Sequence, residues 1–187
     1  MREYLKSFDI LTEDEIDLFE KLIVRKSIKK GDFFIQEGHT CKEIAFIESG
    51  LFRSYYYSSE GEEVTYCFSF SNSFTSAYSS FLSQTPTVEN IQALTDCELL
   101  TISRREILKL EKTSYNWLKL FKVMAEQEFI GMEKRIFLLQ RGTAEIRYRD
   151  LLSHQPEYLR LIPLSYLSSY LGVTPRHLSR IRKAISN

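Results

Sequence analysis

The sequence predicts an α+β fold with three parts: an antiparallel β-roll of the double-stranded β-helix or jelly-roll type, a long helix, and a C-terminal pair of short helices. Short strand-like runs separated by glycines predict the β-roll. A run of 28 residues from Ser114 to Arg141, which contains no proline, predicts the long helix. Two apolar stripes on either side of a glycine near the C-terminus predict the helix pair.

The N-terminal part opens with a helix and continues with strands. Thr12 and Glu15 form a capping-box pattern ahead of an apolar series, which predicts a helix over residues 12–24. Gly61 separates two strand-like runs as expected of a hairpin, and the close spacing of all the runs favours an antiparallel β-roll over a parallel sheet. The predicted strands span residues 33–36, 44–47, 51–57, 64–70, 88–93 and 98–102.

The long helix carries apolar residues on more than one face. It follows a short helix over residues 104–111 and, at about 114–141, exceeds the usual length of a globular helix. Because a helix that is apolar on two sides packs against two surfaces, we expect it to contact its own β-roll and a second copy of the chain. No heptad register is assigned, since each one puts a charge or a glycine at a core position. Burial within a single chain is the alternative. The residues expected at the dimer contact are Phe121, Met124, Glu128, Gly131, Met132 and Arg135.

Residues 142–187 are predicted to form a helical domain of their own, and residues 1–141 to form a domain that contains the β-roll and the long helix. Gly142 interrupts two helical patterns, and a helix over residues 143–153 ends ahead of Pro156. The final two helices flank a break at Gly172. The second begins near Pro175, because the Thr174 hydroxyl can cap free amides and proline lacks the amide that would be unpaired there. This arrangement is a helix-turn-helix, which is typical of DNA-binding proteins.

Positive charge is concentrated at the C-terminal end. The chain has 25 basic and 25 acidic residues, yet residues 140–187 hold eight basic and three acidic side chains. The last 25 residues contain no Asp or Glu. A local excess of this kind attracts a polyanion and orients the protein on it. Double-stranded DNA is therefore the predicted partner of this end.

The second helix of the motif places its cations on one face. Arg176, Arg180 and Lys183 follow i, i+4 and i+7 spacing, opposite a stripe that includes Leu178 and Ile181. An arginine near the start of a recognition helix can donate two hydrogen bonds to guanine, so the two arginines are expected to read bases and Lys183 to contact phosphate. The alternative is a solvated basic helix that complements its own dipole. The predicted DNA-binding residues are Thr174, Pro175, Arg176, His177, Ser179, Arg180 and Lys183.

Three segments resemble one known family. IPLSYLSSYLGVTPRHLSRIRKAI resembles the helix-turn-helix of the Crp/Fnr family of bacterial transcription regulators. GDFFIQEGHTCKEIAFIESGLFRSYYYSSEGEEVTYCF and ENIQALTDCELLTISRREILKL resemble the first and last strands of that family's cyclic-nucleotide-binding-type β-roll. The resemblance implies a homodimer that regulates transcription at a pseudo-palindromic operator, with RNA polymerase as a further candidate partner. Many members continue into a β-hairpin wing, whereas this sequence stops at Asn187, so a winged-helix-like domain with a truncated wing is expected.

The resemblance also locates an effector region, whose residues argue against cyclic AMP. In family members that bind cyclic nucleotides, a Gly-Glu pair meets the ribose and an Arg-Ser or Arg-Thr pair meets the cyclic phosphate. Here Ser76-Ala77 and Thr87-Val88 stand in line with these pairs. Without the arginine fork nothing replaces the hydration of the phosphate, so we expect no cyclic AMP binding of the usual kind and predict no cofactor. The loop hydroxyls suit an uncharged ligand or are ordinary turn groups. The candidate effector-pocket residues are Thr75, Ser76, Ala77, Tyr78, Thr87 and Val88.

Metal binding and catalysis are not expected. Cys41, Cys67 and Cys97 are scattered and lack CxxC spacing, which predicts buried free thiols. An iron–sulfur sensor needs about four cysteine ligands, and His39 is the only histidine in the predicted β-roll. A cupin-like metal enzyme would need several converging ligands, and no catalytic fingerprint is present. A regulatory or scaffold protein that does not bind DNA is the remaining alternative.

Composition predicts a globular, cytoplasmic protein without a membrane partner. Hydrophobic residues make up 43% of the chain, which suffices for real cores. No apolar run approaches the roughly 18 residues needed to cross a bilayer, and the N-terminus lacks a signal-type apolar core.

Overall fold

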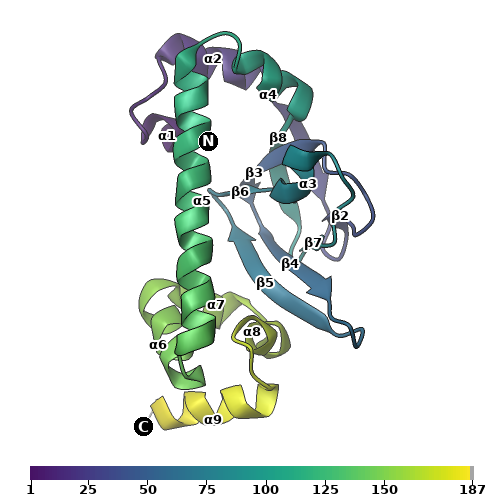
Figure 1. Ribbon diagram of the computed structural model, residues 1–187, viewed down its shortest axis with the longest axis vertical. Coiled ribbons are helices and arrows are strands. Elements are labelled where there is room, and N and C mark those ends of the chain that lie inside the picture. The colour runs from purple at the N-terminus through teal and green to yellow at the C-terminus, as the bar shows by residue number, and fades with distance from the viewer. Residues whose placement is uncertain (186–187) are drawn as a thin grey trace. The chain divides into compact units, whose positions relative to one another are not determined.

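The computed structural model describes residues 1–185 and has the predicted α+β fold, with two antiparallel four-stranded sheets (Figure 1). The strand order is β1-β8-β3-β6 in the first sheet and β2-β7-β4-β5 in the second. Strands that are distant in sequence are neighbours in both sheets, as in a β-roll. The strands are β1 (Val24–Ile28), β2 (Phe33–Ile35), β3 (Glu43–Ser49), β4 (Leu51–Tyr57), β5 (Glu63–Phe70), β6 (Phe74–Thr75), β7 (Asn90–Ala93) and β8 (Cys97–Ser103).

The strand register and one tight turn position the sheets. Ala45 of β3 pairs with Thr101 of β8 on one side and with Thr75 of β6 on the other. The β4–β5 hairpin turns at Gly61, whose φ of +81° lies in the left-handed region that favours glycine. The Gly61 amide donates a 3.0 Å hydrogen bond to the Ser58 carbonyl. The predicted hairpin is confirmed.

The predicted helices begin and end close to where the sequence patterns place them. The capping box of α2 is present: the Thr12 hydroxyl accepts from the Glu15 amide at 3.3 Å, and the Glu15 carboxylate accepts from the Thr12 amide at 2.8 Å. The predicted long helix is confirmed as α5. The helices are α1 (Arg2–Lys6), α2 (Glu13–Leu22), α3 (Tyr78–Ser83), α4 (Arg104–Leu110), α5 (Tyr115–Arg141), α6 (Ala144–His154), α7 (Pro156–Leu161), α8 (Leu164–Tyr170) and α9 (Pro175–Ile185).

Strand β1 corrects the prediction of a helix over residues 12–24. Helix α2 ends at Leu22, and Val24 is the first residue of a strand that pairs with β8. Four of the five residues of β1 are exposed, so the strand has no apolar alternation by which the sequence could reveal it. Hydrogen bonds to β8 define β1, and the sequence of residues 24–28 alone does not predict these long-range bonds.

Further short elements were also not predicted. These are α1, α3, α7 and the two-residue strand β6. Pro156 does follow the end of α6, as expected, but it then occupies the first turn of α7, where its missing amide costs nothing. Strand β7 begins at Asn90 instead of at residue 88, and the Val88 side chain is 74% exposed.

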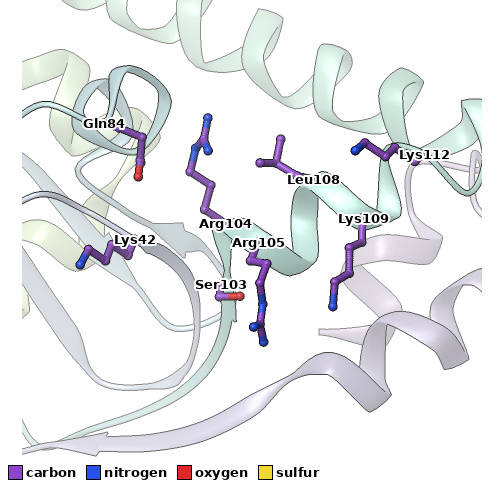
Figure 2. A pocket seen from close by; sticks show the side chains of 8 residues that line it. All are labelled: Lys42, Gln84, Ser103, Arg104, Arg105, Leu108, Lys109 and Lys112. Carbon is purple, nitrogen blue, oxygen red and sulfur yellow. The ribbon is translucent and has the colours of Figure 1, made fainter.

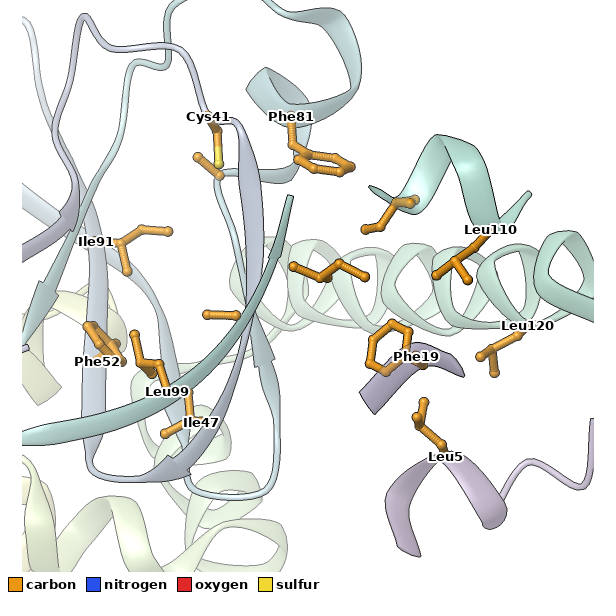
Figure 3. Packing of buried hydrophobic residues seen from close by; sticks show 14 of the residues in the cluster. Leu5, Phe19, Cys41, Ile47, Phe52, Phe81, Ile91, Leu99, Leu110 and Leu120 are labelled. Carbon is orange, nitrogen blue, oxygen red and sulfur yellow. The ribbon is translucent and has the colours of Figure 1, made fainter. Parts of the chain in front are cut away.

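The core of the β-roll joins residues from both sheets and from the flanking helices (Figure 3). Ile47, Phe52 and Leu99 come from three strands, whereas Phe19 and Leu110 come from helices. Phe19 stacks on Trp117 of α5 with ring centroids 5.4 Å apart. Burial of these side chains provides the main stabilisation of the sheets. Cys41 and Cys97 are buried free thiols as predicted, whereas Cys67 is only partly buried.

The chain forms two compact units. One contains residues 1–56 and 67–125, and the other contains the hairpin residues 57–66 together with the chain from Glu126 onward. Helix α5 therefore begins in the first unit and ends in the second. Within residues 1–185, none of the helices combines the length and the apolar character that a transmembrane span requires.

Candidate DNA-binding site and effector region

Helix α8 ends in a hydrogen-bonded glycine turn. The Gly172 amide donates to the Ser169 carbonyl and the Val173 amide to the Ser168 carbonyl, both at 3.0 Å. This pair of bonds is the Schellman motif, and Gly172 supplies the left-handed conformation that it requires, with φ of +65°. The glycine in the predicted break therefore sets the angle at which the chain leaves α8 and enters α9.

Helix α9 begins at Pro175 with the predicted cap. The Thr174 hydroxyl accepts a hydrogen bond from the His177 amide at 3.2 Å. Pro175 occupies the first helical position, where an amide would have no partner in the helix. The cap and the proline fix the N-terminal end of α9, so the first turn presents its side chains in a defined direction.

The two faces of α9 differ completely in burial. Leu178 and Ile181 are buried, and α9 packs against α8 and α6. Arg176, Arg180 and Lys183 are exposed. In the described part of the chain these three cations form no ion pair with a carboxylate, so their charge faces solvent. His177 is exposed as well, while the Ser179 hydroxyl donates to the Pro175 carbonyl at 2.9 Å.

Two arginines outside the motif hold it in place. Arg147 of α6 donates to the Leu171 carbonyl at 2.8 Å and to the Gly142 carbonyl at 2.6 Å, so it ties the end of α5 to the turn after α8. Arg135 of α5 donates to the carbonyl of Tyr170, and its guanidinium lies 3.6 Å from the centre of the Tyr170 ring. Charge-assisted bonds of this kind are about twice as strong as neutral ones.

Residues 57–66, at the tip of the β4–β5 hairpin, belong to the same compact unit and contact α8. The Ser169 hydroxyl accepts from the Thr65 amide at 2.9 Å and donates to the Glu63 carbonyl at 3.2 Å. Arg135 donates to the Tyr66 carbonyl at 3.1 Å. The hairpin tip, the second half of α5 and the helix-turn-helix are therefore linked by polar contacts through Ser169 and Arg135.

The predicted dimer-contact residues occupy different environments. Phe121 and Met124 are partly buried against the core of the β-roll. Glu128, Gly131 and Met132 are exposed. Arg135, as described above, is engaged within its own chain. Exposed large apolar side chains instead mark the second half of α5: Phe129, Ile130, Met132, Ile136, Phe137 and Leu139.

The predicted effector-pocket residues lie around the start of α3 and the loop after it, and they differ in exposure. Thr75, Ala77 and Thr87 are buried, whereas the Tyr78 and Val88 side chains are exposed. The Ser76 hydroxyl donates to the Glu43 carbonyl at 3.2 Å. The Thr87 hydroxyl accepts from the Glu89 amide at 3.2 Å. Ring stacking places Tyr78 on Phe81, with centroids 6.1 Å apart.

Three polar residues near this region were missed by sequence reasoning. Arg53 of β4 is buried, and its guanidinium lies 4.3 Å from the centre of the Tyr55 ring. Burial raises the pKa of Glu89 to about 7. Asn90 is buried, and its side-chain oxygen accepts a hydrogen bond from the Glu37 backbone amide. Its side-chain nitrogen has no partner among the described residues. For Arg53 the sequence did offer a signal, because it is a charged residue within the apolar run LFRSYYY.

No metal centre is formed by the described residues. No group of three or more His, Cys, Asp or Glu side chains comes together in residues 1–185. His39 is exposed, and its ring lies against the Gln36 carbonyl at 3.3 Å.

The profile of a known domain family matches the β-roll. The family is described as the cyclic nucleotide-binding domain, and the match covers residues 25–114. Residues 25–114 are therefore similar to a cyclic nucleotide-binding domain. The match includes strands β2 to β8, helix α4 and all of β1 except Val24. A search of curated protein sequences found no significant match.

Solved structures extend the comparison beyond the cyclic nucleotide-binding domain. FixK2 from Bradyrhizobium japonicum superposes with a TM-score of 0.76 at 19% identity, covering 88% of this chain and 84% of its own. The c-di-GMP-responsive global regulator CLP from Xanthomonas campestris gives 0.73 at 16% identity, covering 94% and 92%. A transcriptional regulator of the Crp/Fnr family from Eubacterium rectale gives 0.71 at 18% identity, covering 98% and 88%. The fold is that of the Crp/Fnr regulators, which confirms the resemblance seen in the sequence.

Proposed function

We propose that this chain is a sequence-specific DNA-binding transcription regulator and has no catalytic activity. The observation that carries the proposal is the exposed, uncompensated cationic face of α9, fixed by the Thr174 cap and the Schellman turn. Arg176 and Arg180 lie in the first two turns, where a recognition helix enters the major groove. Lys183 lies one turn further on, and its proposed role is to contact a DNA phosphate. RNA polymerase stays a candidate partner.

We further propose that the regulator acts as a homodimer through the second half of α5. The six exposed apolar side chains of this segment offer a surface whose burial would be favourable by roughly 25 cal/mol per Å². A two-fold dimer would present two copies of α9 to successive major grooves, about 34 Å apart. The operator is then a pseudo-palindrome. In this assignment residues 1–141 form the sensor with the dimer helix, and residues 142–187 form the DNA-binding domain.

The effector, in this proposal, is not cyclic AMP bound in the manner usual for the family. No arginine stands at Thr87-Val88, and no carboxylate stands at Ser76-Ala77. The Ser76 hydroxyl is engaged by a backbone carbonyl and Val88 points to solvent. Titration calorimetry with cyclic AMP tests this point, and a micromolar dissociation constant would overturn it.

The decisive experiment for the function is selection of bound duplexes from a random DNA library at about 150 mM salt, where nonspecific attraction to phosphate is largely suppressed. We expect enrichment of an inverted repeat. If the folded dimer enriches no sequence, either with or without a cell extract as a source of effectors, the C-terminal motif does not read DNA. A regulatory protein that binds other partners would then replace the proposal.

Three substitutions test the assigned roles on the selected site. Arg176→Ala and Arg180→Ala should each lose about 1–3 kcal/mol of discrimination between the operator and a mutated operator. Lys183→Ala should weaken binding to both duplexes alike and reduce the salt dependence. Lys30→Ala, which removes an exposed cation from the first unit, is the matched control. Equal effects of all three α9 substitutions on both duplexes would refute the division of roles.

A further inference from the structure

A basic groove lies on the first unit, apart from every residue assigned above. It encloses about 610 Å³ and is lined by residues of α4 and of the segments around it (Figure 2). Five of its eight lining residues are cations, and none is a carboxylate. The lining residues are Lys42, Gln84, Ser103, Arg104, Arg105, Leu108, Lys109 and Lys112.

The helical spacing divides the cations into two groups. Figure 2 shows Arg104, Leu108 and Lys112 along one side of α4 and its C-terminal turn, with Arg105 and Lys109 pointing away from them. Glu106 neutralises the second group, because its carboxylate accepts from Arg105 at 3.0 Å and from Lys109 at 2.9 Å. Among residues 1–185, no carboxylate pairs with the first group. Positive charge is therefore left uncompensated on the Arg104 side of the groove.

Arg104 is held in position for binding. Its Nε donates to the Phe81 carbonyl of α3 at 3.1 Å, and the side chain is partly buried. Within residues 1–185 the terminal nitrogens of this guanidinium have no hydrogen-bond partner, so one edge of the fork faces the groove. Lys42 and Lys112 are exposed and, over the same residues, form no ion pair. A guanidinium that is anchored at Nε can donate two parallel bonds to a phosphate at little entropic cost.

The other walls supply groups for the remainder of a ligand. Gln84 caps α3 in the left-handed conformation, with φ of +59°, and its side-chain nitrogen donates to the Phe81 and Cys41 carbonyls. Its side-chain oxygen then remains as an acceptor at the rim. Leu108 exposes an apolar surface in the groove. The volume lies within the range of small-molecule sites, roughly 300–1,000 Å³.

We propose that this groove binds a small phosphorylated molecule of the nucleoside diphosphate class, with Arg104 and Lys112 on the phosphates and Leu108 against the base or sugar. The ligand would brace α3 against α4, which leads into α5. This site is separate from the candidate effector region at Thr75–Tyr78 and Thr87-Val88, and it does not depend on the proposed DNA binding.

The test is fluorescence anisotropy of a methylanthraniloyl-labelled ADP titrated with the full-length protein. We expect saturable binding that pyrophosphate displaces and adenosine does not, and that weakens as salt is raised. Arg104→Gln should lower the affinity about tenfold or more. Lys112→Glu should do the same, and because its side chain is exposed and unpaired it leaves the fold intact. Lys21→Gln removes a comparable exposed cation from α2 and should change nothing.

Three results would overturn the proposal. The first is the absence of binding by the labelled ADP and by pyrophosphate at millimolar concentration. The second is an affinity for labelled ADP that neither Arg104→Gln nor Lys112→Glu lowers, whether or not cyclic AMP displaces the label. The ligand would then occupy another site. The third is tight binding of polyglutamate without binding of ADP, which would make the groove a docking surface for an acidic protein.

Discussion

The two halves of α5 carry similar apolar side chains in opposite environments. In the first half Trp117 and Leu120 are completely buried in the core of the β-roll. In the second half Phe129 and Met132 are 67% and 62% exposed. An apolar pattern shows that a side chain prefers burial, but it does not identify the surface that provides it. Trp117 and Leu120 satisfy that preference within one chain, and the proposed dimer would satisfy it for the second half.

The largest expected effect comes from the buried half. Trp117→Ala should lower the free energy of unfolding by about 3–5 kcal/mol, because it opens a large cavity beside Phe19. Urea unfolding followed by circular dichroism measures this change. Trp117→Phe should cost much less, since the indole nitrogen has no hydrogen-bond partner among the described residues. A loss below about 1 kcal/mol for Trp117→Ala would show that this half of the helix is not part of the core.

Substitutions in the exposed second half of α5 should weaken dimerisation and leave the stability of the monomer unchanged. Phe129→Ala and Met132→Ala should each weaken dimerisation by about 2 kcal/mol, because both side chains lie on the proposed contact surface. Sedimentation equilibrium over a range of concentrations gives the dissociation constant. Leu118→Ala, which truncates an exposed side chain in the first half, is the matched control. Unchanged dimerisation in both variants would place the interface elsewhere.

Substitution of Arg135 tests whether this residue stabilises its own chain or contacts the second subunit. Arg135→Ala removes the bonds to the Tyr66 and Tyr170 carbonyls and should destabilise the second unit by about 1.5–3 kcal/mol. Hydrogen exchange of the α8 amides reports this loss, and the dimer constant should change less. Arg135→Lys should recover only part of the loss, because lysine lacks the planar fork. A drop in dimerisation without faster exchange in α8 would reverse the assignment.

Gly131 gives the smallest and sharpest test. In the single chain a Cβ at this position meets no atom within 4 Å, so Gly131→Ala should stabilise the helix by about 0.5–1 kcal/mol. Thermal unfolding measures the gain. If the dimer seam requires close backbone approach at Gly131, the same substitution should weaken dimerisation while leaving that gain intact. An unchanged dimer constant would place the glycine outside the seam.

Local chemistry made the C-terminal motif predictable. The Thr174 cap, the first-turn Pro175 and the left-handed Gly172 each act over a few residues, so their sequence signals match the structure directly. The same holds for the capping box at Thr12 and for the hairpin at Gly61. The effector region was less predictable, because buried polar residues such as Arg53 and Asn90 owe their environment to strands that are distant in sequence.

The sequence by itself determined the starts of α2 and α9, the polarity of α9 and the spacing of most strands, since these depend on side chains a few residues apart. Only the tertiary structure decided that Val24–Ile28 is a strand, because its bonds go to β8. The tertiary structure also shows that Arg135 hydrogen-bonds to the hairpin and to α8, and that Arg104 lies in a basic groove beside α3. Each of these contacts joins residues brought together by folding of the whole unit, and no local pattern encodes such a contact.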